Sequence, residues 1–211
     1  YIDIVFILLE QGAYIDMPDG SGNTALNWAV LSNNIDIVRY LVDSDADINL
    51  SDFYERSPLY EASHEGHIDI IKILVEAGAD VNKADNNGHA PLHWASYNGH
   101  LDILRYLLGK GANIYCVDSR GSTPLHYASF EAHIDIIRCL VEAGAELNIS
   151  NDDGKTAFDI ACDKGFLEIS ELIKPLEQVE RSNNSLCFAG YNNGSYSSRS
   201  NDQTTDNSPS K

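Results

Sequence analysis

The sequence predicts an all-α solenoid, in which helix-turn-helix units stack side by side and are joined by β-turn or hairpin loops. Three observations lead to this prediction. Two apolar motifs and one turn motif recur along the chain, and successive copies lie 33 residues apart. A single unit of this size has too little apolar surface to fold alone. Units stacked at a constant step bury each other's apolar faces, which gives a one-dimensional array.

The first apolar motif predicts a helix early in each unit. In the copy at 90–95, Pro91 suits the first turn of a helix, where its missing N–H costs nothing, while Leu92 and Ala95 face inward. The helix is expected to end at Gly99. The five copies are TALNWA at 24–29, SPLYEA at 57–62, APLHWA at 90–95, TPLHYA at 123–128 and TAFDIA at 156–161.

The second apolar motif predicts the second helix of each unit. Leu101, Leu104, Leu107 and Leu108 have the spacing that places them on one face of an amphipathic helix, and Gly111 is expected to end it. The six copies are IDIVFILL at 2–9, IDIVRYLV at 35–42, IDIIKILV at 68–75, LDILRYLL at 101–108, IDIIRCLV at 134–141 and LEISELIK at 167–174.

The turn after the second helix includes a segment that looks like a metal site. LVDSDADIN at 41–49 carries aspartates at alternating positions, as a calcium-binding loop does. Such a loop also needs glycine at its sixth position and glutamate at its twelfth, where this chain has Ile48 and Tyr54. The 33-residue register places the same segment at a turn, so we interpret these aspartates as turn residues.

Three residues depart from the turn pattern. Asp45, Glu55 and Ala132 occupy positions at which other units carry glycine. If those positions require a positive φ, each of the three costs on the order of 1 kcal/mol.

Together the motifs resemble the ankyrin repeat, a unit of 33 residues with the signature T-P-L-H-x-A. The resemblance implies an ankyrin-repeat solenoid with a truncated first repeat at 1–18. Five further repeats are expected within 19–175, at 19–51, 52–84, 85–117, 118–150 and 151–175. The Ser/Asn-rich segment 176–211 has little to bury, so we expect a disordered tail there.

The charge of the chain limits its partners. The formal net charge is −18, from 14 Lys and Arg against 32 Asp and Glu. This balance opposes nucleic-acid binding, because that binding needs basic residues to neutralise phosphates. It also opposes docking on an anionic membrane surface. A solvated acidic surface and a partner protein with a basic surface are the remaining interpretations.

The cysteines favour a reducing compartment, since the four of them form no CxxC pair and no disulfide framework. We expect a cytoplasmic protein, with the nucleus as the alternative. Cys139 and Cys162 are expected to be buried and Cys116 to lie at the surface. The chain has no initiator Met and opens on a second-helix motif, so we expect a monomeric array within a longer protein.

Neither the histidines nor the cysteines form a catalytic or metal-ligating pattern. The resemblance implies that His93 and His126, at the His position of the signature, hydrogen-bond the neighbouring turn. HEGH at 64–67 is not the HExxH zinc motif, and the chain has no glycine-rich phosphate loop. We expect no catalytic residue, no cofactor and no metal site.

The resemblance also implies where a partner binds, because ankyrin repeats usually use the turn tips and the exposed first-helix positions on their concave face. The residues expected to contact a partner are Phe53, Tyr54, Arg56, His64, Glu65, Asn86, Asn87, His89, Tyr97, Asn98, Ser119, Arg120, Phe130 and Glu131. The last repeat adds Asp152, Asp153, Lys155, Asp163 and Lys164 at the same positions.

Large aromatic residues, which are enriched at interface hot spots, stand out in this set. We hypothesise that they form a central binding patch with two arginines, against the alternative of scattered surface aromatics. The six residues are Phe53, Tyr54, Tyr97, Phe130, Arg56 and Arg120.

Three asparagines are candidates for modification. Asn49, Asn82 and Asn148 each follow a leucine by eight residues. This spacing resembles the site that an asparaginyl hydroxylase modifies in ankyrin repeats. The alternative is a structural turn asparagine.

The function predicted from the resemblance is protein–protein recognition by a scaffold or adaptor with no catalysis of its own. The alternative is a regulatory or targeting ankyrin domain of a larger enzyme, channel or ubiquitin-ligase subunit.

Overall fold

The helix pairs predicted from the two apolar motifs are present in the computed structural model, which describes residues 2–166, 168 and 169. Within these residues the structure has ten helices and no strand. The helices are α1 (Ile2–Glu10), α2 (Ala25–Leu31), α3 (Ile35–Asp43), α4 (Pro58–Glu65), α5 (Ile68–Glu76), α6 (Pro91–Tyr97), α7 (Leu101–Gly109), α8 (Pro124–Phe130), α9 (Ile134–Glu142) and α10 (Ala157–Asp163).

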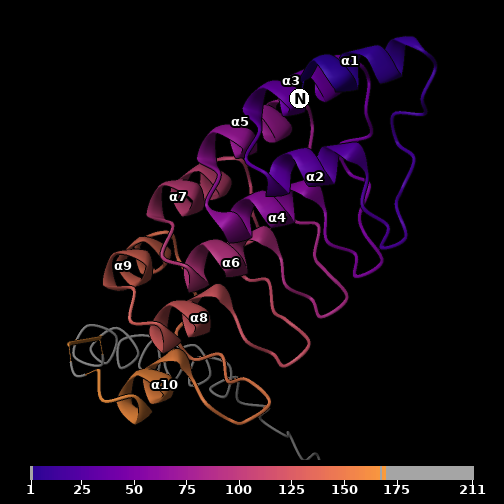
Figure 1. The fold of residues 1–211 in the computed structure, drawn as a ribbon. Helices are drawn as coiled ribbons and strands as arrows, with labels where there is room; N and C mark the ends of the chain where they lie inside the picture. Colours follow the sequence, from indigo (N-terminus) through magenta and orange to yellow (C-terminus); the bar gives the residue numbers. More distant parts are fainter. Residues whose placement is uncertain (1, 167, 170–211) are drawn as a thin grey trace, which may run out of the picture.

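The helices lie in two layers (Figure 1). The first-helix layer consists of α2, α4, α6, α8 and α10, each packed on the next, and the second-helix layer consists of α1, α3, α5, α7 and α9. Long loops extend beyond the first-helix layer (Figure 1). This arrangement confirms the predicted all-α solenoid of stacked helix pairs.

Equivalent leucines of successive units line up in the interior. Leu59, Leu92 and Leu125 are each at most 1% exposed, and Ile103 and Ile136 of the second-helix layer are equally buried. Complete burial of one such side chain stabilises the fold by about 1.5–3 kcal/mol. Each helix pair therefore depends on its neighbours for its core.

The His position of the signature caps the first helix. Nδ1 of His93 accepts a hydrogen bond from the backbone N–H of Ala90 at 3.0 Å, and Nε2 lies 3.2 Å from the carbonyl oxygen of Ser122 in the next unit. Burial lowers the pKa of His93 to about 4, so the ring is neutral and Nδ1 can accept. The side chain of Asn27 takes the same role toward Thr24 in an earlier unit, at 3.0 Å.

Backbone hydrogen bonds tie the loop tips to one another. Each bond runs from an N–H at one tip to a carbonyl oxygen at the preceding tip, so the tips form a continuous row. The four bonds are Phe53 to Ser21 (3.1 Å), Asn86 to Tyr54 (3.0 Å), Ser119 to Asn87 (2.8 Å) and Asp152 to Arg120 (2.8 Å).

All three residues that replace a turn glycine adopt a positive φ: 62° at Asp45, 61° at Glu55 and 60° at Ala132. Asn33 does so too, with φ 50°, although the repeat pattern did not single it out. Asn33 stands 33 residues before Gly66, at the turn between the two helices of a unit. Asparagine enters this region at a lower cost than most non-glycine residues, which explains why the turn forms there.

None of the three cysteine expectations holds in full. Cys139 is half-buried against the core rather than buried. Cys162 is exposed rather than buried. Its equivalent Ser129 is buried in α8, which packs against α10, whereas no described helix follows α10 in the first-helix layer. Cys116 is half-buried rather than at the surface, and its sulfur lies 3.7 Å from Nδ1 of His93. Burial raises the pKa of the Cys116 thiol to about 12, so it is not a thiolate at neutral pH.

The two ends of the array differ from its middle. In α1, Ile4, Ile7 and Leu8 are each more than half exposed. At the other end, the predicted helix at 167–174 falls within the described residues only at 168 and 169, and the predicted tail at 176–211 lies outside them. None of the described helices is long and apolar enough to cross a membrane.

Candidate partner-binding groove

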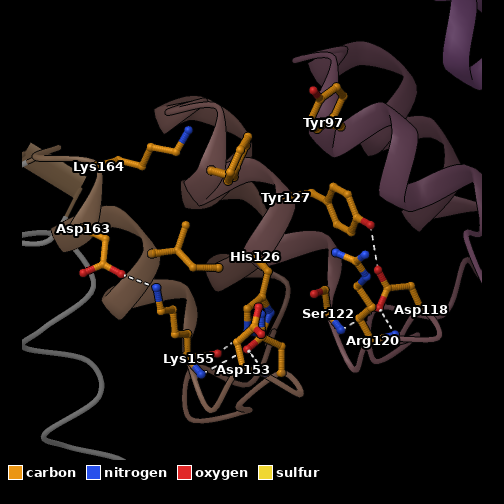
Figure 2. Close-up of a pocket in the computed structure, with 13 residues that line it drawn as sticks. Tyr97, Asp118, Arg120, Ser122, His126, Tyr127, Asp153, Lys155, Asp163 and Lys164 are labelled. Atoms are coloured by element: carbon orange, nitrogen blue, oxygen red, sulfur yellow. Dashed lines mark hydrogen bonds and ion pairs between the residues drawn. The ribbon is translucent and has the colours of Figure 1, made fainter.

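A groove of about 470 Å³ lies between α8 and α10 (Figure 2). We call this the α8–α10 groove. Its large aromatic and aliphatic lining residues, which we call the floor, are Tyr97 from the end of α6, Tyr127 and Phe130 from α8, and Ile160 from α10. Its exposed charged lining residues, which we call the rim, are Arg120, Asp153, Lys155, Asp163 and Lys164.

One aromatic side chain of the floor is partly open to solvent. Phe130 is 41% exposed, and Nζ of Lys164 lies 3.5 Å from the centroid of its ring. This is a cation–π contact between α8 and α10, which the packing of the two helices brings together.

An ion pair closes the side of the groove next to α10. Nζ of Lys155, in the loop before α10, lies 2.6 Å from Oδ2 of Asp163 at the end of α10 (Figure 2). Both side chains are about half exposed, so solvent screens the pair and it contributes little to stability. Its effect is to position the loop against the helix.

A polar network beneath the groove fixes Tyr127. Its hydroxyl donates to Oδ2 of Asp118 at 2.6 Å (Figure 2), and Nε2 of His89 lies 2.9 Å from the same hydroxyl. Nδ1 of His89 lies 3.2 Å from Oδ2 of Asp85. Burial alone would raise the pKa of Asp118, but hydrogen bonds from Tyr127 and from backbone N–H groups outweigh it and lower that pKa. Asp118 is therefore a carboxylate at neutral pH.

The aromatic surface continues from the groove toward α4. The ring centroid of Trp94 lies 4.6 Å from that of His64, 5.3 Å from His89 and 5.8 Å from Tyr97, mostly in edge-to-face arrangements. Tyr97 in turn lies 6.0 Å from Tyr127. Such contacts stabilise the packing of these side chains beyond the burial of each ring.

Comparison with protein families agrees with this architecture. A family model described as ankyrin repeats in three copies matches residues 1–52, 47–118 and 92–183. The chain belongs to the ankyrin repeat family. No curated protein matches it. Ankyrin repeats are generally protein–protein interaction modules, and the family is typically non-catalytic.

The ankyrin array divides the residues that were expected to form one central patch. Tyr97, Arg120 and Phe130 line the α8–α10 groove. Phe53 and Tyr54 lie at a different tip, and the loop that carries Asn86 and Asn87 lies between, as the tip hydrogen bonds require. The structure therefore gives two aromatic sites, one in the α8–α10 groove at the ends of α6 and α8 and one at the loop tip that carries Phe53 and Tyr54.

The remaining candidate contact residues differ in exposure. Those exposed are Phe53, Tyr54, Glu65, Asn86, Asn87, Ser119, Arg120, Phe130 and Glu131, and those half-buried are Arg56, His64, His89, Tyr97 and Asn98. His89 differs most from the expectation, because both of its ring nitrogens already have oxygen partners within the array.

The second aromatic site, at Phe53 and Tyr54, is connected through Arg56 to the buried carboxylate of Glu61. The ring of Tyr54 lies over the guanidinium of Arg56, with 5.2 Å to the ring centroid. Nε of Arg56 donates to Asp52 at 2.8 Å, and Nη1 lies 3.2 Å from Oε1 of Glu61. Burial raises the pKa of Glu61, which stands in α4 at the position that Trp94 occupies in α6.

Two of the candidate hydroxylation sites take part in turns. Oδ1 of Asn49 accepts the backbone N–H of Asp80 at 2.9 Å, and Oδ1 of Asn82 accepts that of Asn113 at 2.7 Å. Asn148 is exposed. These bonds fit the alternative of a structural asparagine, and hydroxylation stays a prediction.

The sequence-based candidates leave out several groove residues, among them Asp118, Tyr127 and Ile160, and Tyr127 is the one that best shows what signal was available. The available signal was its register, since Tyr127 stands 33 residues after Trp94 and 99 after Trp28 in the first-helix motif. The position is large and aromatic in three units, but only the structure shows its hydroxyl bonded to Asp118.

Proposed function

We propose that this ankyrin array is a scaffold or adaptor module that holds a segment of a partner protein in the α8–α10 groove and carries out no chemistry of its own. The observation that carries the proposal is the combination in one hollow of an accessible aromatic floor with a charged rim. A groove of about 470 Å³ has room for roughly two large side chains of a bound segment.

The chemistry of the groove favours binding. Aromatic residues at the centre of a contact surface, enclosed by a polar rim, are the usual source of binding energy in protein interfaces. The histidine that lines this groove is occupied, since Nδ1 of His126 lies 3.1 Å from the backbone N of Thr123 and Nε2 lies 3.1 Å from the carbonyl oxygen of Lys155. This use of His126 supports a structural role for it rather than one in proton transfer.

Site-specific photo-crosslinking tests the proposal. A benzophenone amino acid replaces Glu131, beside the floor residue Phe130, or Arg138, which is exposed on α9. We expect a discrete crosslinked species in cells from position 131 and none from position 138. The crosslink should disappear when Phe130→Ala is added to the position-131 variant. A crosslink of equal yield from both positions, or one that survives Phe130→Ala, would count against the groove as the binding site.

A further inference from the structure

The groove already holds a cation of its own. Nζ of Lys164 lies 3.5 Å from the centroid of the Phe130 ring, within the range of a cation–π contact. Lys164 is exposed at the C-terminal end of α10, so this contact is made at the surface of the protein. The aromatic face at Phe130 is therefore a place where an ammonium group is held next to protein rather than left in solvent.

Acidic groups stand close to the groove. Asp163 lines it, and Glu131 is exposed and follows Phe130 in the chain. The negative charge of Glu131 raises the pKa of the Tyr97 hydroxyl at the edge of the groove, which indicates that its carboxylate acts on this part of the surface. An incoming cation would therefore meet negative charge at this edge of the groove as well as an aromatic face.

The charge of the whole chain acts in the same direction. A net charge of −18 attracts basic segments to the surface and slows the approach of acidic ones. The rim also carries basic side chains. Lys155 is paired with Asp163 and Lys164 lies over Phe130, whereas an acidic side chain of a partner could pair with Arg120 in the loop before α8. An acidic partner would approach against the field of the chain, so the balance favours a basic one.

We propose that the ring face of Phe130 binds a lysine or arginine side chain of the bound segment. This side chain displaces Lys164 from the ring. The bound segment is then a basic one that carries at least one bulky apolar residue for the rest of the floor. This inference rests on the proposed function, and it specifies which class of partner the groove selects.

Peptide selection on the full chain tests the inference without knowledge of the partner. A phage library of random 12-residue peptides is selected on the wild-type protein and counter-selected on Phe130→Leu, which keeps an apolar side chain but removes the aromatic face. We expect the peptides lost on Phe130→Leu to be enriched in Lys or Arg over the unselected library. Enrichment in Asp or Glu, or no binder that depends on Phe130, would overturn the inference.

A double-mutant comparison measures the contact itself. In a selected peptide the cationic residue is replaced by norleucine, and binding is measured by calorimetry. We expect about three- to fivefold weaker binding to the wild type and no change with Phe130→Leu, because a cation–π contact at an exposed site has that magnitude. Equal losses on both proteins would show that the cation does not sit on Phe130.

Lys164→Met provides a second variant that keeps the aliphatic stem. We expect it to bind the same peptide at least as tightly as the wild type, since no internal cation has to leave the ring. Weaker binding would mean that Lys164 contacts the peptide instead of giving way, and would overturn the displacement. Peptides that need Phe130 but carry no cation would refute this inference and leave the proposed function intact. The proposed function is tested separately, by the crosslinks from positions 131 and 138.

Discussion

Nε2 of His89 lies 2.9 Å from the hydroxyl oxygen of Tyr127, and this contact joins two consecutive repeats. His89 precedes α6, whereas Tyr127 is in α8. The Tyr127 hydroxyl also donates a hydrogen bond to Asp118, in the loop before α8. The network therefore links the two helices whose residues form one side of the α8–α10 groove. Its polar groups are largely enclosed, since the side chains of Asp85 and Asp118 are at most 6% exposed.

Removal of the Tyr127 hydroxyl should weaken this link. Tyr127→Phe leaves Asp118 and His89 each without one partner, and we expect the free energy of unfolding to fall by about 1–3 kcal/mol, the cost of a buried polar group left unsatisfied. Urea denaturation followed by circular dichroism measures it. Tyr115→Phe, on an exposed tyrosine, is the matched control and should change stability by less than about 0.5 kcal/mol. Equal effects of the two variants would contradict a linking role for Tyr127.

The left-handed backbone at Ala132 offers a stabilising substitution. Ala132 has φ 60°, so Ala132→Gly should stabilise the array by about 1 kcal/mol through relief of backbone strain. Ala143 caps α9 with φ −80°, and Ala143→Gly should be neutral or destabilising. Urea midpoints of the two variants compare the sites directly. A loss of stability in both would mean that strain at Ala132 does not limit the fold.

Stability should depend on pH through His93. Burial lowers its pKa to about 4, below the value of about 6.5 expected for the unfolded chain. The unfolded state therefore binds the proton first as the pH falls, and His93 destabilises the fold progressively between about pH 6.5 and pH 4. Linkage gives a loss of about 2 kcal/mol between pH 7 and pH 5.

The variant His93→Asn isolates this contribution. Asparagine caps the equivalent helix at Asn27, and it does not titrate in this range. We expect the difference in unfolding free energy between wild type and variant to move by about 2 kcal/mol in favour of the variant from pH 7 to pH 5. His126, whose pKa burial also lowers, is common to both proteins and cancels. A pH-independent difference would show that His93 is protonated equally in the folded and unfolded states.

The buried carboxylate of Glu61 should make Arg56 important for stability. Arg56→Met leaves Glu61 enclosed without its cation, and we expect a loss of about 3 kcal/mol, as for breaking one side of a buried pair. Arg138→Met removes an arginine that is exposed on α9 and should cost less than about 0.5 kcal/mol. Adding Glu61→Gln to Arg56→Met should restore part of the loss. If the double variant is no more stable than Arg56→Met, the cost does not arise from the charge of Glu61.

The repeat register predicted the features that depend on local spacing. It placed Leu59, Leu92 and Leu125 in the interior and three of the non-glycine residues at positive φ, because equivalent positions of a stacked array have equivalent surroundings. It also assigned a capping role to His93, since that bond is made within the first turn of the same helix.

The register could not locate the groove, because every repeat has the same positions for tips and first-helix residues. The feature that distinguishes one junction from the next is the pairing of unlike side chains across it. Lys164 meets Phe130, and His89 meets Tyr127, only because the two members of each pair come from neighbouring repeats. The same reason explains the error at Cys162, whose exposure depends on the neighbours of α10 rather than on its own motif.

The bond between His89 and Tyr127 also bears on how the protein would come apart under force. A linear array pulled from its two ends transmits the same load through every junction, and the weakest junction yields first. We expect the outer helix pairs to unfold one after another. Helices α6 and α8, which the contact between His89 and Tyr127 joins, should separate last.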